Sequence, residues 1–271
     1  MDCSRAFSRR WGPKMGPKNK NERMKTIAMI PARYASTRFH AKLMQLLGDK
    51  PVIRHTYDAT VATGLFDEVA VITDSKIIFD EIVSNGGVAL MSKNEHESGS
   101  DRIAEAVADM DVDVIINVQG DTPFVKKDPL RRLIEQFRDP SVKVASLMQV
   151  LTEKEFINNP SFVKVTVDRN NNSLLFSRSP IPYPRSEEPP ITYYKHIGVY
   201  AFRKQALMDF TTWPVTPLEA AEKIECLRYL EYGIQLKMVE VDYMGVEIDT
   251  PEDLERAIKS LEKTGDKQGG K

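Results

Sequence analysis

Cysteine is scarce in this chain of 271 residues, which contains only Cys3 and Cys226. The two lie far apart in the sequence, and neither stands at the spacing of a CxxC motif or of a Cys/His set of zinc ligands. This scarcity argues against a disulfide framework and against structural zinc. It favours a reduced, cytoplasmic protein.

Long hydrophobic runs and an excess of one charge are also missing. No stretch approaches the roughly 18 consecutive apolar residues of a membrane-spanning helix, so the sequence predicts no membrane span. Lys and Arg total 38 against 39 Asp and Glu, which leaves no overall positive field to hold nucleic acid. An anionic small molecule must therefore be bound by a local cluster of side chains.

Two glycine-rich phosphate motifs are absent as well. The chain has neither the GxGxxG loop of dinucleotide-binding folds nor the GxxxxGK loop of P-loop proteins. Any phosphate site here must be built in another way.

The first 23 residues contain seven basic and two acidic residues and almost no apolar periodicity. Such a segment cannot bury enough apolar surface to order itself, so we expect 1–23 to be a disordered basic leader or tag. A transit peptide, a vector leader and an upstream start before Met24 all explain its composition. The remainder, 24–271, is expected to form a single domain.

From Met24 onward, short apolar runs alternate with segments of helical periodicity. This alternation predicts right-handed crossovers and a mainly parallel sheet, with ligands bound at the loops that follow Ile30, Thr73 and Val118. Pro51 is expected in the first turn of a helix. We expect strands at 26–31, 68–73, near 88 and at 112–118, and helices at about 52–60, 75–85 and 100–110.

After Lys143 the pattern becomes rich in strands. The segment 180–190 carries five prolines and is expected to be an extended excursion. We interpret about 140–205 as a β-rich lobe that makes a dimer contact. Its expected strands are 144–147, 163–167, 174–176 and 197–202, and helices are expected at 217–232 and 250–261.

The loop from Pro31 to Lys42 offers two arginines, two hydroxyls and a lysine soon after the first strand. Guanidinium and ammonium groups stabilise a triphosphate whose leaving pyrophosphate gains charge. The loop is therefore a candidate phosphate site, and a solvated basic loop is the alternative.

Two aspartates end apolar runs at places suited to a metal ion. Asp121 follows the run ending at Val118, and Asp249 stands before a helix that Thr250 is expected to cap. Mg²⁺ prefers hard oxygen ligands and usually takes one or two carboxylates plus substrate phosphates. Each residue alone is equally consistent with a turn or a cap.

Eight motifs in chain order resemble those of the 3-deoxy-manno-octulosonate (Kdo) cytidylyltransferase family. The resemblance runs from Lys25 to about Leu261. The motifs are IPARYASTR (30–38) with Lys42, ITD (72–74), EHESGSDR (95–102), NVQGD (117–121), FSR (176–178), KHIGVYAF (195–202), PLE (217–219) and IDTPEDL (248–254).

The resemblance implies an α/β, GT-A-like nucleotidyltransferase fold, with a mainly parallel mixed sheet flanked by helices and a small β-rich dimerisation lobe. It also implies a cytoplasmic homodimer that uses Mg²⁺. The implied reaction transfers CMP from CTP to the 2-hydroxyl of Kdo, for lipopolysaccharide biosynthesis, and releases pyrophosphate.

The resemblance further assigns roles to residues of this sequence. Arg33, Lys42, Asp121 and Asp249 would be catalytic, and the two aspartates would hold the metal. The nucleotide would be bound by Ala32, Arg33, Ser36, Lys42, Ser98, Gly99, Asp101 and Arg102. The acid sugar would face Gln119, Arg178, His196, Glu222 and Glu225.

The side-chain chemistry supports one of these assignments and leaves two others open. Arg178 suits a sugar carboxylate because a guanidinium binds it through two hydrogen bonds. His196 and Glu225 are equally interpretable as hydrogen-bonded wall residues. We take His55 and His96 as structural or surface residues.

The chain departs from the family pattern at three places. Phe39-His40-Ala41 stands where the family usually has a Pro-Gly run before the lysine, Thr122 replaces a carboxylate beside the expected metal site, and Cys226 stands where glutamine is common. These changes leave open a preference for 8-amino-Kdo. A cytidylyltransferase for a sialic-acid-like sugar and a catalytically silent nucleotide-binding protein also stay open as interpretations.

Overall fold

The computed structural model describes residues 23–35, 39–96, 98–186, 188, 190–242 and 247–265. The chain divides into two compact units: unit 1 comprises residues 1–127 and 245–271, and unit 2 comprises residues 128–244. The β-rich lobe expected at about 140–205 falls within unit 2. Residues 1–22 of the predicted leader lie outside the described residues. So does Ser36, which was predicted to bind the nucleotide.

The sheet of unit 1 is parallel and almost completely buried. Its strand order is β6-β1-β4-β5, and every neighbouring pair runs in parallel. Because the strands are apolar on both faces, they are continuous hydrophobic runs rather than alternating patterns. The bounds are β1 (Thr26–Ala32), β4 (Glu68–Thr73), β5 (Ala89–Met91) and β6 (Val114–Asn117).

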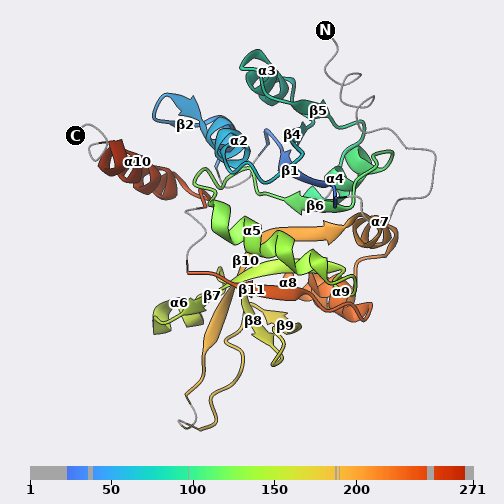
Figure 1. Cartoon of the computed structure of the whole chain (residues 1–271). Helices are drawn as coiled ribbons and strands as arrows, with labels where there is room; N and C mark the ends of the chain where they lie inside the picture. The colour runs from blue at the N-terminus through green and yellow to red at the C-terminus, as the bar shows by residue number, and fades with distance from the viewer. Residues whose placement is uncertain are drawn as a thin grey trace. The chain divides into compact units, whose positions relative to one another are not determined.

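Helices cover this parallel sheet, as the alternation predicted (Figure 1). The helix predicted at about 52–60 is confirmed as α2, which buries one face made of Val52, Ile53, Thr56, Tyr57 and Thr60. The described helices of unit 1 are α2 (Val52–Ala62), α3 (Lys76–Ser84), α4 (Gly99–Val107) and α10 (Pro251–Gly265), with a short 3₁₀ turn, η1 (Lys42–Met44).

Pro51 does not stand in the first turn of α2. It is the N-cap residue, with an extended backbone at φ −61° and ψ 149°, and it ends β3 (Lys50–Pro51). That strand pairs antiparallel with β2 (Leu46–Leu47), so the extended conformation is fixed by the hairpin before the helix begins.

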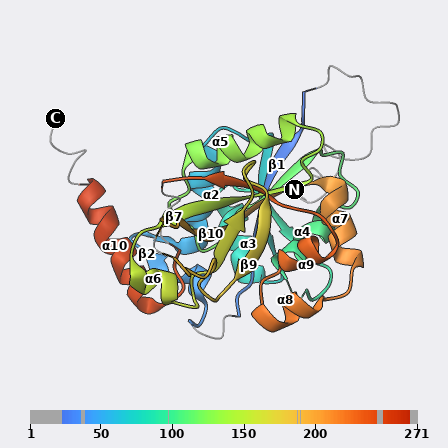
Figure 2. The ribbon, with the colours of Figure 1, turned by 90° about the horizontal axis from the view of Figure 1, so that it is seen from below.

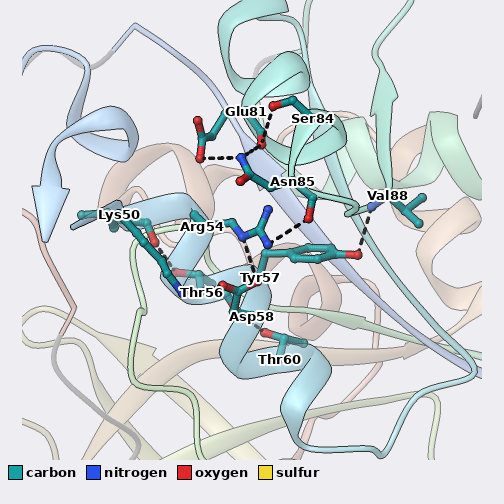
Figure 3. Close-up of polar contacts among 11 residues, drawn as sticks. Lys50, Arg54, Thr56, Tyr57, Asp58, Thr60, Glu81, Ser84, Asn85 and Val88 are labelled. Atoms are coloured by element: carbon teal, nitrogen blue, oxygen red, sulfur yellow. Dashed lines mark hydrogen bonds and ion pairs between the residues drawn. The ribbon is translucent and has the colours of Figure 1, made fainter. Parts of the chain in front are cut away.

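Polar contacts join α2 to the end of α3, as Figure 3 shows. The Tyr57 hydroxyl accepts a hydrogen bond from the Val88 amide at 2.9 Å. Arg54 donates to the Asn85 carbonyl at 3.1 Å and lies 2.8 Å from Asp58 on its own helix. These contacts fix the turn that leads from α3 into β5.

Unit 2 contains a mixed sheet. Strand β10 runs antiparallel to β7 and β8, β8 runs antiparallel to β9, and β11 runs parallel to β7. With the parallel sheet of unit 1, this gives the mostly parallel, helix-flanked α/β arrangement that was predicted. The bounds are β7 (Val144–Leu151), β8 (Lys164–Val167), β9 (Ser173–Ser177), β10 (Tyr193–Arg203) and β11 (Lys237–Glu240).

The helices of unit 2 gather at two ends of its sheet. In Figures 1 and 2, α7, α8 and α9 lie together on one side and α6 lies on the other. Helix α5 (Lys127–Glu135) begins at the boundary of the unit and continues into a 3₁₀ turn, η2 (Gln136–Arg138). The remaining helices are α6 (Lys154–Asn158), α7 (Lys204–Thr212), α8 (Pro217–Glu222) and α9 (Leu227–Glu231).

The single helix predicted over 217–232 is wrong, because α8 and α9 are separate. Lys223 adopts a left-handed conformation with φ 53° and ends α8. The turn lets Arg228 reach back to Glu219, with both ion-pair contacts at 2.7 Å. A continuous helix would place these two residues nine positions apart, about 13 Å along its axis.

The proline-rich segment leaves β9 and returns into β10 as an extended loop, as predicted (Figure 1). Tyr183 in this loop is 83% exposed. None of the helices formed by the described residues is long and apolar enough to cross a membrane.

Candidate functional site

Lys42 and the two predicted metal aspartates meet in unit 1. The Lys42 ammonium lies 2.5 Å from Asp121 Oδ2 and 2.9 Å from Asp249 Oδ1. Lys42 is mostly buried, whereas Asp249 has 42% of its side chain exposed. Three residues that are far apart in the sequence therefore form one charged cluster, open to solvent on the Asp249 side.

The carboxyl end of β6 brings Asp121 to this cluster. The Val118 amide donates to the Met29 carbonyl at 3.0 Å, which extends the β6–β1 pairing by one step. Thr56 on α2 donates its hydroxyl to the Gly120 carbonyl at 2.8 Å. A Cβ on Gly120 would lie 3.2 Å from the Pro31 carbonyl oxygen, so glycine allows the loop after β6 to approach the end of β1 closely.

Asp249 is brought to the cluster by its backbone and by the helix that follows. The Ile248 amide donates to the Asp121 carbonyl at 2.9 Å. Thr250 and Asp253 exchange hydrogen bonds at the start of α10, as the predicted cap requires. The end of the apolar run that Asp249 closes, residues 247–249, has no regular secondary structure.

The electrostatics of the cluster favour a bound cation. Burial opposes the charge on Lys42, but Asp121 and Asp249 outweigh it and raise the pKa of the ammonium. Lys42 is therefore charged at neutral pH and lies between two acidic side chains. Two carboxylates that converge on one cation fit the hard-oxygen chemistry of Mg²⁺. No group of three or more His, Cys, Asp or Glu side chains in the described ranges forms a metal cage.

A cavity of about 180 Å³ lies in unit 1, at the loop after β1 and the start of α4. It is a polar cavity, because arginine, histidine, serine and glutamine side chains contribute to its wall. The lining residues are Pro31, Ala32, Arg33, His96, Ser98, Gly99, Arg102 and Gln119. Six of these eight were predicted to bind the nucleotide or the sugar.

The first turn of α4 forms part of the cavity wall. Ser98 caps the helix, since its hydroxyl accepts from the Asp101 amide at 3.1 Å and donates to the Asp101 carboxylate at 2.8 Å. A Cβ on Gly99 would lie 3.1 Å from Pro31 Cγ. The helix start therefore packs directly on the end of β1, and the N-terminus of a helix favours an anion.

Arg102 adds a buried positive charge to the same wall. Its Nη2 donates to Asp74 at 2.6 Å, and its side chain is only 6% exposed. Its Nη1 is buried and has no hydrogen-bond partner in the described structure, and neither has Asn117 Oδ1. Buried polar groups are normally paired, so these two atoms keep unused hydrogen-bonding capacity.

Two of the eight lining residues, Pro31 and His96, were not among those predicted to bind the nucleotide or the sugar. His96, taken as structural or surface, lines the wall and lies 2.7 Å from Glu105. Glu105 also accepts from the Lys93 amide and the Asn94 side chain. Burial opposes its charge, but the hydrogen bonds from Lys93, His96 and Asn94 lower its pKa. The sequence contained a signal for this role of His96. It lies two residues before the predicted nucleotide residue Ser98, close to the start of a predicted helix.

Four of the five predicted sugar residues lie in unit 2, and Arg178 is held there by backbone carbonyls. Its guanidinium donates to the carbonyls of Glu222 at 2.7 Å, Pro160 at 2.9 Å and Lys223 at 3.4 Å. Three of its five N–H groups are therefore engaged by the protein. Its contact with a sugar carboxylate stays a prediction.

Glu222 lies against the same arginine. Its carboxylate accepts from the Ser177 hydroxyl at 2.6 Å and from the Arg178 amide at 2.9 Å. Each carboxylate oxygen thus has a protein partner, which makes Glu222 an anchor for the end of β9. Glu225 lies in the turn between α8 and α9.

His196 occupies a buried aromatic environment in the same unit. Its Nε2 lies 2.9 Å from the Ser146 hydroxyl, and its ring contacts those of Phe176 and Tyr200. Burial, with a smaller contribution from Lys195, lowers the pKa of His196 to about 3. The imidazole is therefore neutral at physiological pH, and its contact with a substrate stays a prediction.

Most of the chain matches one protein family. A family model described as cytidylyltransferase matches residues 27–240. The chain belongs to this cytidylyltransferase family.

Individual relatives agree with that assignment. This cytidylyltransferase is 61% identical to 3-deoxy-manno-octulosonate cytidylyltransferase of Flavobacterium johnsoniae, over 88% of this chain and 99% of the relative. It is 56% identical to the protein of the same name from Christiangramia forsetii, over 87% and 96%.

Solved structures give the same fold. A structure of CMP:2-keto-3-deoxy-manno-octonic acid synthetase complexed with CTP matches with a TM-score of 0.85 and 37% identity, over 89% of this chain and 99% of that chain. A 4-diphosphocytidyl-2C-methyl-D-erythritol synthase of Anaerococcus prevotii matches with a TM-score of 0.58 at 17% identity, which shows the shared fold alone. The predicted nucleotidyltransferase fold is confirmed.

Proposed function

We propose that this cytidylyltransferase transfers CMP from CTP to the 2-hydroxyl of Kdo, giving CMP-Kdo and pyrophosphate for lipopolysaccharide biosynthesis. The observation that carries the proposal is the convergence of Lys42, Asp121 and Asp249 at the carboxyl ends of the unit 1 strands. The names of the 61% and 56% identical relatives support the choice of sugar.

We assign CTP to the cavity of unit 1 and its surroundings. Arg33 and the buried Arg102 Nη1 supply positive charge for the phosphates, and the amides at the start of α4 add hydrogen-bond donors. In-line transfer of a nucleotidyl group depends mainly on positioning and charge stabilisation, so the protein needs no covalent intermediate.

Lys42 is assigned to the charge that develops during transfer. Its ammonium is held in place by two carboxylates, which fixes its position before substrate binds. A preorganised cation of this kind stabilises negative charge on a phosphate without reorganising during the reaction.

Asp121 and Asp249 would hold the magnesium ion. When bound, Mg²⁺ would neutralise phosphate charge and acidify the attacking hydroxyl. We expect Asp121→Asn and Asp249→Asn each to abolish magnesium-dependent turnover while the protein stays folded. Calorimetric titration with MgCl₂ and CTP provides a second readout, and unchanged magnesium affinity in either variant would count against that ligand.

We also propose that the enzyme is a homodimer and that it is cytoplasmic. The lobe of unit 2 exposes apolar side chains, among them Leu174 at 54% and Tyr183 at 83%, which supports a homodimer contact. Light scattering after size-exclusion chromatography tests this, and a monomer mass would contradict it. A buried, free Cys226 and the use of CTP support a cytoplasmic enzyme.

The reaction is tested by measuring pyrophosphate release from CTP and Mg²⁺ with Kdo, 8-amino-Kdo and N-acetylneuraminate supplied separately. We expect turnover with Kdo above the other two. Faster turnover with 8-amino-Kdo or N-acetylneuraminate would move the assignment to that sugar. A protein that binds CTP but releases no pyrophosphate with any of the three would be a catalytically silent nucleotide-binding protein.

A further inference from the structure

A lysine is fully buried in unit 2. Lys164 begins β8 and has 0% of its surface exposed. It pairs with Ser177 on β9 and with Lys195 on β10. A position at the centre of three strands is normally occupied by an apolar residue.

The Lys164 ammonium contacts backbone carbonyls. Its Nζ donates to the Asn159 carbonyl at 3.1 Å and to the Arg178 carbonyl. Burial lowers the pKa of this lysine, the Glu222 carboxylate opposes the shift, and Arg178 adds to it. Taking an ammonium out of water costs several kcal/mol, and an apolar residue of the same volume would often serve stability as well or better. Stability alone therefore does not explain the charge.

What Lys164 holds is the main chain of a predicted sugar residue. The Arg178 carbonyl accepts from Lys164, and the Arg178 amide donates to Glu222 at 2.9 Å. The side chain of Arg178 is fixed in turn by the carbonyls of Pro160, Glu222 and Lys223. Both the backbone and the guanidinium of one residue are thus held from several directions.

Basic side chains outnumber acidic ones in this cluster. It contains Lys164 and Arg178 against one acidic side chain, that of Glu222. The protein engages three of the five guanidinium N–H groups, which leaves two, the number that a bidentate carboxylate takes. An acid sugar brings one carboxylate.

We propose that Lys164 is a positioning residue for the acid sugar: by holding the Arg178 carbonyl it directs the guanidinium toward the carboxylate of the substrate. The inference rests on the proposed function, because Arg178 acts on a sugar only if that reaction occurs. Lys164 itself, fully buried, does not touch the substrate.

The test compares Lys164→Met with the matched control Lys237→Met in the purified full-length enzyme. Lys237 also lies on a strand of unit 2 and also donates its ammonium to a backbone carbonyl, that of Asn170, but it is far in sequence from Arg178. We expect Lys164→Met to raise the KM for Kdo about tenfold or more and to leave the KM for CTP within about twofold. The control should change neither.

A second variant guards against loss of folding. Ser177→Ala removes the hydroxyl that donates to Glu222 and leaves the buried lysine in place. We expect a smaller rise in the KM for Kdo, about threefold, again without a change for CTP.

The outcomes separate the two proposals. If the parent enzyme releases no pyrophosphate with Kdo, the proposed function fails. If the parent is active and Lys164→Met raises both KM values equally, or neither, the positioning role is overturned. If Lys164→Met does not fold, an unchanged KM for Kdo in Ser177→Ala overturns it.

Discussion

The two units use buried charge in different ways. In unit 1, Lys42 lies between two carboxylates near solvent, and Arg102 has a buried Nη1 without a partner in the described structure. In unit 2, the Lys164 ammonium donates to the backbone carbonyls of Asn159 and Arg178. The first arrangement leaves charge available for a ligand, and the second fixes the chain.

This difference separates residues that would act on CTP from residues that would support a site. A charge that acts on substrate must keep hydrogen-bonding capacity, whereas a charge that anchors the backbone gives it up. Substitutions should therefore lower turnover in unit 1 and lower stability or sugar affinity in unit 2. Variants that affect only one of these properties test the comparison.

The largest effect on stability is expected at the ion pair between α8 and α9. Arg228 is 9% exposed and its partner Glu219 is 11% exposed, and Arg228 also donates to the Phe210 and Trp213 carbonyls. Arg228→Met leaves a buried carboxylate without its partner, so we expect unfolding to become easier by about 3–5 kcal/mol. Urea denaturation measures this.

The double variant Glu219→Leu/Arg228→Met serves as the control. Since it removes both charges, much of the lost stability should return. A double variant as unstable as Arg228→Met would mean that packing, rather than an unpaired charge, accounts for the loss.

In unit 1 the largest effect is expected on the rate of turnover rather than on stability. Lys42→Met should lower kcat about a hundredfold to a thousandfold, because it removes a preorganised cation. The free energy of unfolding should change much less than in Arg228→Met, since Asp121 and Asp249 are partly exposed and can be hydrated. Steady-state kinetics beside urea denaturation measures both quantities. Turnover within about twofold of the parent would refute the role given to Lys42.

His196 gives a pH-dependent prediction for unit 2. Its pKa falls from 6.5 to about 3 on folding, so the unfolded chain binds the proton more tightly. Stability from this residue is therefore present above about pH 6.5 and is lost as the pH falls toward 3. From pH 7 to 5 the loss should reach about 2 kcal/mol.

Thermal unfolding of the parent and of His196→Asn at both pH values isolates this contribution. The variant lacks the titrating group, so its stability should fall less between pH 7 and pH 5. Equal losses in the two proteins would show that the ring is not held neutral by burial among Phe176, Tyr200 and Ser146.

The parallel sheet of unit 1 was predictable because its strands are continuous apolar runs separated by helical periods. The cluster of Lys42, Asp121 and Asp249 followed from the family resemblance, and the positions of Asp121 and Asp249 after apolar runs agreed with it. Periodicity could not show that the Ile248 amide donates to Asp121, because a hydrogen bond between residues so far apart leaves no local pattern.

Unit 2 was harder to predict. The short strand β11 and the break at Lys223 depend on tertiary contacts, such as the pairing of Met238 with Ser146 and the return of Arg228 to Glu219. Lys164 has the sequence character of a solvated strand residue, and only the surrounding strands reveal its burial. Local propensity carries no information about such partners.

The smallest effect is expected at Ala41, just before Lys42. Ala41 has φ 49°, in the left-handed region that glycine adopts easily, and it stands where the family usually has glycine. Relief of about 1–2 kcal/mol of backbone strain in Ala41→Gly is offset by the extra entropy of glycine in the unfolded chain.

We expect a net gain in stability below about 1 kcal/mol, measured by urea denaturation. Turnover should stay within about twofold of the parent, because the position of Lys42 is retained. Ala41 is only 6% exposed. A loss of stability in Ala41→Gly would therefore mean that the packing of its methyl group outweighs the backbone strain.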